Sequence, residues 1–196
     1  MKTGENAQYH PYSCHTTRAA LCLVACVSLS FTLGWHANSG GNVEIHPPAQ
    51  PAVYFSPKGG IKQTIADNIL RAHEEILVAL YYFTDPGLAD TLIEAHQRGV
   101  RVHIILDKSQ RNGKHSQARK LSDAGLSVVF DSKHRIFHHK FMVIDKAIVV
   151  TGSQNWTKSA EHHNAENILH LQNNELAAQF CDQFMSLLQS IKNDKS

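Results

Sequence analysis

The sequence predicts an α/β fold in which helices cover both faces of a mixed, mostly parallel central sheet. Short apolar runs alternate along the chain with longer stretches whose apolar residues recur every three or four positions. This order of strand, helix, strand and helix is typical of a sheet built from crossover units. One run, residues 75–83, is apolar almost throughout. Such a strand is expected where a sheet is buried on both faces.

The first strand and helix are expected at residues 52–56 (AVYFS) and 60–72. The helix is indicated by Ile61, Ile65 and Ile69, which are spaced four residues apart and therefore share one face. The second strand, residues 75–83 (EILVALYYF), ends before a Pro-Gly pair that favours a turn.

Two further helices and two further strands follow. Residues 88–98 form a helix that ends at Gly99, and residues 116–123 form a helix that ends before Gly125, because glycine favours the helix C-terminus. The intervening apolar runs predict strands at residues 100–107 and 126–131.

The alternation then breaks. Residues 140–145 (KFMVID) and 147–153 (AIVVTGS) are apolar runs joined at Asp145 and Lys146, which is the spacing of a β-hairpin. Residues 167–172 predict a further strand, and residues 174–191 predict an amphipathic helix. The hairpin sequence occurs once in the chain.

Length and composition predict one ordinary domain. The chain has 196 residues and a formal net charge of +2, so a nucleic-acid partner would have to meet a local basic patch. Of four cysteines only Cys181 lies beyond residue 26. This excludes a disulfide-stapled scaffold and a structural four-thiolate zinc site.

Residues 1–37 are expected to be an export signal or membrane anchor with a leader. The apolar run at residues 19–35 falls between the length of a signal peptide and that of the shortest spanning helix. Either outcome exports the rest of the chain, to the periplasm or the exterior, and an uncleaved run anchors it in the membrane. A buried helix is the alternative. Residues 38–51 read as a linker rich in Gly, Pro, Asn and Ser, and residues 52–196 as the domain.

Polar residues stand at both ends of the predicted hairpin. Strand alternation places His138 and Lys140 on one face and His139 on the other. The start of one strand lies beside the end of its antiparallel partner, so Ser153 and Asn155 are expected next to them. These groups suit phosphodiester cleavage, which needs a nucleophile, a proton donor and groups that bind the phosphate oxygens.

The spacing His138-x-Lys140, Asp145 and Gly152-Ser153-x-Asn155 resembles the HKD motif of the phospholipase D superfamily. The resemblance extends from about residue 53 to the C-terminal helix, and it is strongest to the small, single-motif bacterial endonucleases of the family. It implies a phospholipase D-like sandwich and an endonuclease that hydrolyses nucleic-acid phosphodiesters with little sequence specificity. It also implies that the enzyme needs no metal or other cofactor.

The same resemblance implies a role for each site residue. His138 would attack phosphorus and form a phosphohistidine. Lys140 and Asn155 would bind the non-bridging oxygens, with help from Ser153. Glu166 occupies the place of the downstream acid that orients the histidine, and a carboxylate on Nδ1 would leave Nε2 free to attack.

This route uses two histidines, one to attack and one to protonate the leaving group, but the chain carries one motif. The small family members that it resembles pair two subunits, each of which donates one motif. A homodimer with one composite active site is therefore expected, and DNA and RNA both remain candidate substrates.

Other residues have weaker claims. Lys108, Arg111 and Lys114 follow a parallel strand, where ligands tend to bind, so they are candidate phosphate contacts; a solvated loop is the alternative. Trp156 is a candidate for stacking on a base or for the core. Histidines near His139 raise the possibility of a metal site, but adjacent strand positions face opposite ways, and no metal is expected.

Asp145 belongs to the motif but lies at the hairpin turn, where aspartate has a conformational role, and it is interpreted as structural. Two other functions compete with the nuclease. One is a lipid phosphodiesterase of the phospholipase D type, and the other is a catalytically silent nucleic-acid-binding protein. The second is disfavoured because a silent fold need not keep the full set of site residues.

Overall fold

The structure is a computed structural model of the chain, and it describes residues 50–193. The expected export signal or anchor at residues 1–37 and nearly all of the linker at residues 38–51 lie outside the described residues. Within the described range, no helix is both long enough and apolar enough to cross a membrane.

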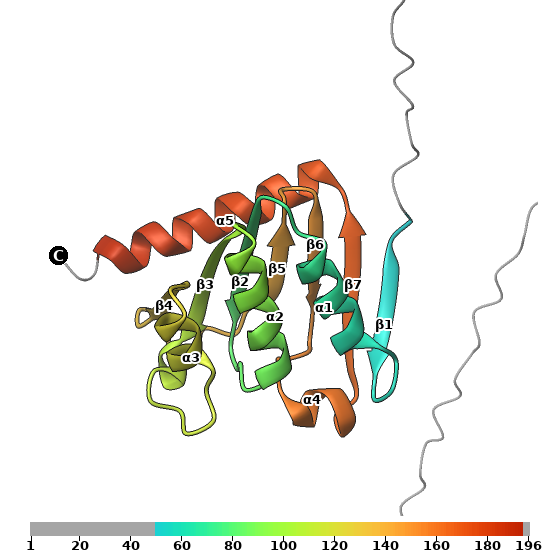
Figure 1. The fold of residues 1–196 in the computed structure, drawn as a ribbon, viewed down its shortest axis with the longest axis horizontal. Helices are drawn as coiled ribbons and strands as arrows, with labels where there is room; N and C mark the ends of the chain where they lie inside the picture. The colour runs from blue at the N-terminus through green and yellow to red at the C-terminus, as the bar shows by residue number, and fades with distance from the viewer. Residues whose placement is uncertain (1–49, 194–196) are drawn as a thin grey trace, which may run out of the picture. The chain divides into compact units, whose positions relative to one another are not determined.

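The described residues form one seven-stranded sheet with the strand order β1-β7-β6-β5-β2-β3-β4 (Figure 1). Its strands are β1 (Ala52–Ser56), β2 (Glu75–Leu80), β3 (Arg101–Asp107), β4 (Ser127–Asp131), β5 (Lys140–Ile144), β6 (Ile148–Gly152) and β7 (Glu166–Gln172). The helices are α1 (Ile61–Leu70), α2 (Pro86–Gln97), α3 (Ala118–Asp123), α4 (Lys158–His162) and α5 (Asn174–Asn193), with a short 3₁₀ helix, η1 (Lys108–Gln110).

The sheet is mostly antiparallel, which corrects the prediction of a mostly parallel sheet. Only β2, β3 and β4 run parallel, because α2 and α3 carry the chain back between them. The other four pairs, from β1 to β2 along the sheet order, are antiparallel. The helix α1 does not place β1 beside β2; β1 lies at the far edge, next to β7. Alternation along the sequence therefore did not reveal which strands pair.

Helices cover both faces of the sheet, as predicted. The helices α1 to α3 pack on one face and α5 packs on the other (Figure 1). Strand β5 shows how the sequence divides between the two layers. Met142 and Ile144 are buried on the α1 side, whereas Phe141 and Val143 are buried on the α5 side. The predicted stripe of Ile61, Ile65 and Ile69 is fully buried.

The turn between β5 and β6 confirms the structural interpretation of Asp145. Asp145 and Lys146 have φ values of 49° and 54°, as a tight two-residue hairpin requires. The Asp145 carboxylate accepts the backbone N–H groups of His73, Glu74 and Glu75 at 2.8–3.0 Å. Partial burial alone raises the pKa of Asp145, but these three donors outweigh it and hold the pKa below its usual value. The residue thus ties the hairpin to the start of β2.

Candidate functional site

The predicted site residues gather at the end of the sheet where β5 begins and β6 ends, at the bottom of Figure 1. Phe141 pairs with Thr151 at this end of the ladder, and the Thr151 hydroxyl donates to the Lys140 carbonyl at 3.2 Å. The buried middle of the hairpin therefore sets the distance between its polar ends, as expected.

His138 is exposed and lies just before β5. The backbone on either side of it is held from outside its own strand. The buried N–H of Phe137 donates to Asp107 at 2.8 Å, and the carbonyl of His139 accepts the N–H of Tyr81 at 3.0 Å. The His138 ring packs edge-on against the Tyr81 ring, with 4.9 Å between centroids. Its nitrogens bond no other described residue, so they are available to a substrate.

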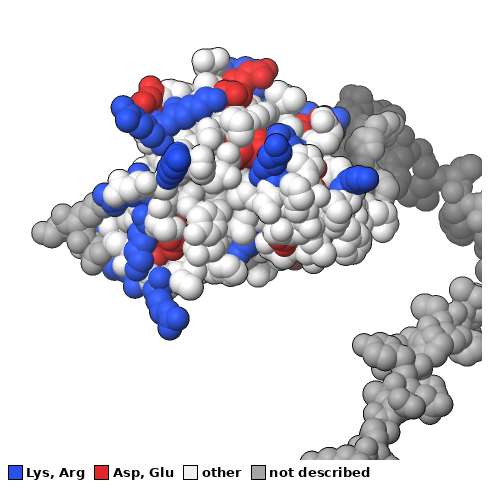
Figure 2. All heavy atoms as spheres, turned by 90° about the horizontal axis from the view of Figure 1, so that it is seen from below, with Lys and Arg blue, Asp and Glu red and all other residues white. Residues whose placement is uncertain are grey.

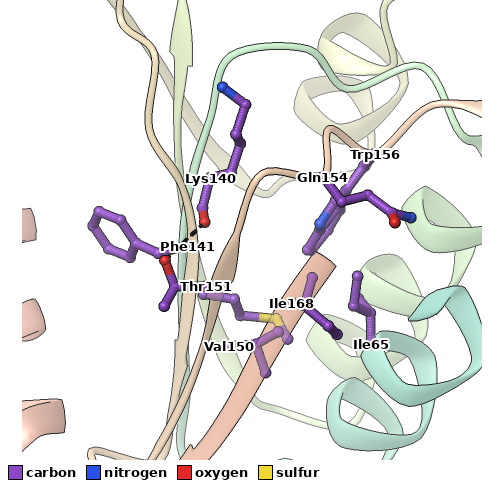
Figure 3. Close-up of a pocket in the computed structure, with 9 residues that line it drawn as sticks. Ile65, Lys140, Phe141, Val150, Thr151, Gln154, Trp156 and Ile168 are labelled. Carbon is purple, nitrogen blue, oxygen red and sulfur yellow. Dashed lines mark hydrogen bonds between the residues drawn. The ribbon is translucent and has the colours of Figure 1, made fainter. Parts of the chain in front are cut away.

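Lys140 lies on the same side as His138, as strand alternation predicted. Its Nζ donates to the His138 carbonyl at 3.0 Å and lies 5.5 Å from the Tyr81 ring centroid. Figure 3 shows the ammonium group directed away from the apolar side chains that line the pocket beneath it. Burial lowers the pKa of Lys140, and the negative charge of Glu166 opposes this shift in part.

Ser153 and Glu166 form one hydrogen-bonded unit. The Ser153 hydroxyl donates to Glu166 Oε2 at 2.5 Å and accepts the N–H of Asn167 at 3.1 Å. Asn164 donates its side-chain amide to Glu166 Oε1 at 3.0 Å. Within residues 50–193 of a single chain the Glu166 carboxylate makes no hydrogen bond to His138, so its orienting role remains a prediction.

Residues of the Gly152–Asn155 turn hold the end of β6 against neighbouring segments. A Cβ on Gly152 would lie 2.1 Å from the Asn167 carbonyl oxygen, so only glycine lets β6 approach β7 this closely. Asn155 Oδ1 accepts the N–H of Tyr82 at 3.2 Å, and its amide NH₂ makes no hydrogen bond to another described residue. Gln154 is buried and donates to Glu161 at 3.1 Å, which connects the turn to α4.

His139 lies on the opposite side of the strand, where its ring contacts Phe137 and Phe141. It lines an apolar cleft of about 210 Å³ together with Phe141, Gln179, Phe180 and Gln183. Burial lowers the pKa of His139, and the charges of nearby His134 and Lys140 lower it further. Among the residues that the structure describes, no group of three or more His, Cys, Asp or Glu side chains is placed to hold a metal.

The basic loop lies at the same end of the sheet, because it follows the carboxyl end of β3 beside β2. Lys108 donates to the His134 carbonyl at 3.1 Å, and Arg111 lies over the Phe130 ring. Both side chains are exposed, as is Lys114. Within residues 50–193 these three side chains make no hydrogen bond to the motif residues.

Trp156, by contrast, is not a surface for base stacking. Its side chain is 4% exposed and packs edge-on against Phe83, with 5.0 Å between ring centroids. The indole is a core residue that joins the chain after β6 to the end of β2. This corrects the candidate role of Trp156 in substrate binding and supports the alternative that it belongs to the core.

Sequence reasoning missed Tyr81 and Asp107, the two residues that contact or hold the motif from neighbouring strands. Each stands at the carboxyl end of a predicted apolar strand, where polar and aromatic groups surround ligands in open α/β sheets. That position was the available signal. The pairing of β2 with β5, which brings Tyr81 to His138, could not be deduced from the alternating pattern.

Comparison with known proteins agrees with this geometry. Residues 65–188 match the family described as "Cardiolipin synthase, PLD-like domain". A protein named phospholipase D from Rickettsia felis is 36% identical over 132 residues, which are 67% of this chain and 66% of that protein. Mitochondrial cardiolipin hydrolase from Xenopus tropicalis is 41% identical over 101 residues, 52% of this chain and 48% of that protein. The matches thus span just under two thirds of the first relative and about half of the second.

Among solved structures, Nuc from Salmonella typhimurium, described as a phospholipase D family member, has a similar fold. The TM-score is 0.68 at 31% sequence identity, and the match covers 71% of this chain and 94% of Nuc. The match therefore extends over nearly all of Nuc.

Proposed function

Because the chain belongs to the phospholipase D superfamily, we propose that it is a phosphodiesterase and, within that class, an endonuclease. It hydrolyses DNA or RNA without a metal ion and with little sequence preference. The observation that carries this choice is the basic surface around the motif. Exposed Lys and Arg side chains lie on the loops at the motif end of the sheet: Lys108, Arg111, Lys114, Lys133 and Arg135.

Figure 2 views the molecule from this end and shows Lys and Arg side chains spread across it. Such a surface binds the repeating phosphates of a nucleic acid and does not distinguish the bases, because contacts to phosphate carry no sequence information. A single phospholipid headgroup would need only the motif itself.

The proposed reaction has two steps. In the first, His138 Nε2 forms a bond to phosphorus while the bond to the leaving oxygen breaks, and a second histidine gives that oxygen its proton. In the second step, this histidine takes a proton from water. The water oxygen bonds to phosphorus and the P–N bond to His138 breaks. Lys140 Nζ and the Asn155 amide hold the non-bridging oxygens throughout.

We propose that the second histidine is His138 of another copy of the chain. Within residues 50–193, His139 faces the other side of the sheet and His134 is bonded to Asp131. Within residues 50–193 of one chain Glu166 makes no hydrogen bond to His138. A carboxylate that accepts the Ser153 hydroxyl can accept further bonds, so the Glu166 of a second copy is a candidate to orient His138. Val53, Phe55 and Leu169 are exposed on the sheet near Glu166 and supply apolar area for such an interface.

A lipid phosphodiesterase is the second candidate, and one observation favours it besides the names of the relatives. The apolar cleft between β5 and α5 starts at His139, next to the motif, and its walls include Phe141 and Phe180. A cleft of this kind could take part of an acyl chain.

The deciding experiment incubates the full chain with plasmid DNA, single-stranded RNA and cardiolipin vesicles in excess EDTA. Cleavage of nucleic acid is expected, and His138→Asn should abolish it while His139→Asn retains most of it. Release of phosphatidic acid without nucleic-acid cleavage would refute the endonuclease and support the lipid phosphodiesterase. Loss of all activity in EDTA, with recovery on adding a divalent metal, would refute the histidine mechanism.

A further inference from the structure

Tyr81 contacts both charged residues of the motif. It follows Leu80, the last residue of β2, and Leu80 pairs with Lys140 across the β2–β5 ladder. The Tyr81 N–H continues this ladder by donating to the His139 carbonyl at 3.0 Å. The backbone therefore fixes the Tyr81 ring directly beside the chain that carries the motif.

The Tyr81 ring restricts His138. The two ring centroids are 4.9 Å apart and the ring planes are inclined by 60°, which is an edge-to-face contact. His138 is otherwise exposed, and its ring makes no hydrogen bond to the described residues that would choose a rotamer. The tyrosine ring is thus a contact that limits where the imidazole points.

The same ring restricts Lys140. The ammonium nitrogen lies 5.5 Å from the Tyr81 centroid, within the range of a cation–π contact, and it also donates to the His138 carbonyl at 3.0 Å. A lysine side chain has four flexible carbons, so it needs at least two contacts to hold its charge in one place. Tyr81 and the His138 carbonyl provide these contacts before any phosphate is bound.

The hydroxyl of Tyr81 is not expected to take part in proton transfer. Its contact with Tyr82 and, to a smaller extent, its burial raise the pKa of Tyr81, which makes the phenol a weaker acid than a free tyrosine. The useful part of the side chain is the aromatic ring.

We propose that Tyr81 is a positioning residue. Its ring sets the rotamer of His138 and the position of the Lys140 ammonium group before substrate binds. The inference rests on the proposed roles of His138 and Lys140. It does not depend on whether the phosphodiester belongs to a nucleic acid or a lipid.

The test compares Tyr81→Leu with Tyr81→Phe on bis(p-nitrophenyl) phosphate, a minimal phosphodiester. Tyr81→Phe keeps the ring and should retain kcat within about twofold. Tyr81→Leu should lower kcat by about 10 to 100-fold with a much smaller change in KM, because misplaced reacting groups slow the chemical step. Tyr54→Leu is the matched control: Tyr54 is a partly exposed tyrosine on β1 whose ring packs on the α1 side, away from the motif, so kcat should be unchanged.

A second readout does not involve activity. In wild type, the Tyr81 ring should shift the NMR signals of the His138 ring protons, which His138→Asn identifies. The shift should persist in Tyr81→Phe and disappear in Tyr81→Leu, or in Tyr81→Met if the leucine variant does not fold. Unchanged His138 signals in the ringless variant, or full kcat without the ring, would overturn the proposal. A wild-type protein that cleaves no phosphodiester would instead refute the proposed function, since the NMR contact would remain.

Discussion

Asp107 is a buried carboxylate at the end of β3, and it holds the backbone that carries His138. It is 4% exposed and accepts the N–H groups of Ser109 at 2.9 Å and Phe137 at 2.8 Å. Burial alone raises the pKa of Asp107, but the bonds from Ser109 and Phe137 and the charge of Lys108 outweigh it, so the net pKa is lowered. The residue is ionised at neutral pH, when it accepts bonds from both segments.

Asp107→Asn should therefore misplace His138 with little change in volume. An amide has one acceptor oxygen, so its NH₂ group would face a backbone N–H and one bond would be lost, at a cost of about 1–3 kcal/mol in the free energy of unfolding. We expect kcat to fall about tenfold or more. Asp131→Asn is the control, because Asp131 is the paired residue on β4, is equally buried and bonds His134 instead of Phe137. Equal losses of kcat in both variants would argue against a positioning role for Asp107.

At the scale of residues, the sequence predicted which residues form the motif and which of them share a strand face. It did not predict the side chains from other strands that contact the motif. His138 and Lys140 share a face because strands alternate, and this needs only local geometry. The Phe137–Asp107 bond spans 30 positions and depends on how β3 is placed in the sheet. The sequence left Trp156 open between base stacking and the core, because an aromatic side chain beside a motif has the same appearance in sequence whether it is buried or exposed.

At the scale of elements, the β5–β6 hairpin is the part of the fold that the sequence predicts best. Two apolar runs and an Asp-Lys turn identify it, and the turn angles agree. The short helix α4 was not predicted, because its five residues are too few to show a period. The sequence predicted too many parallel strand pairs. A helix between two strands does not require those strands to be neighbours in the sheet, and α1 leads from the edge strand β1 to the interior strand β2.

The hairpin turn also allows a pH-dependent test of stability. The pKa of Asp145 is lowered in the folded state, so its contribution to stability is fully present above the unfolded pKa of about 3.9 and is lost as pH falls through the folded value. Asparagine suits the positive φ at this position, and Asp145→Asn should therefore act mainly by losing acceptors.

We expect Asp145→Asn to lower the free energy of unfolding by about 1–3 kcal/mol at pH 7, and we expect this difference from wild type to shrink below about pH 4. Urea denaturation at pH 7 and pH 3.5 measures both values. Asp67→Asn serves as the control, since among the described residues the Asp67 carboxylate accepts a hydrogen bond from the Gln63 side chain on the surface of α1 and none from a backbone N–H. A difference that does not change with pH would show that the charge of Asp145 contributes nothing.

At the scale of the whole molecule, the described part of one chain holds half of the groups that the proposed reaction needs. It supplies one exposed histidine with free ring nitrogens beside Lys140, and its Glu166 is turned toward Ser153. The motif opens at the end of the sheet, where basic loops surround it and apolar side chains of β1 and β7 are exposed. A second copy related by a twofold axis would bring the same residue face to face with itself.

The composite site predicts how activity depends on the mixture of subunits. A dimer of wild type with His138→Asn keeps one attacking histidine but lacks the proton donor, which costs about 10²–10⁴-fold. When wild type is exchanged with this variant at constant total protein, activity should therefore follow the square of the wild-type fraction. His139→Asn in place of His138→Asn is the control and should leave activity nearly constant. A linear fall with His138→Asn, or a fully active species that sediments as a monomer, would show that one motif is sufficient for catalysis.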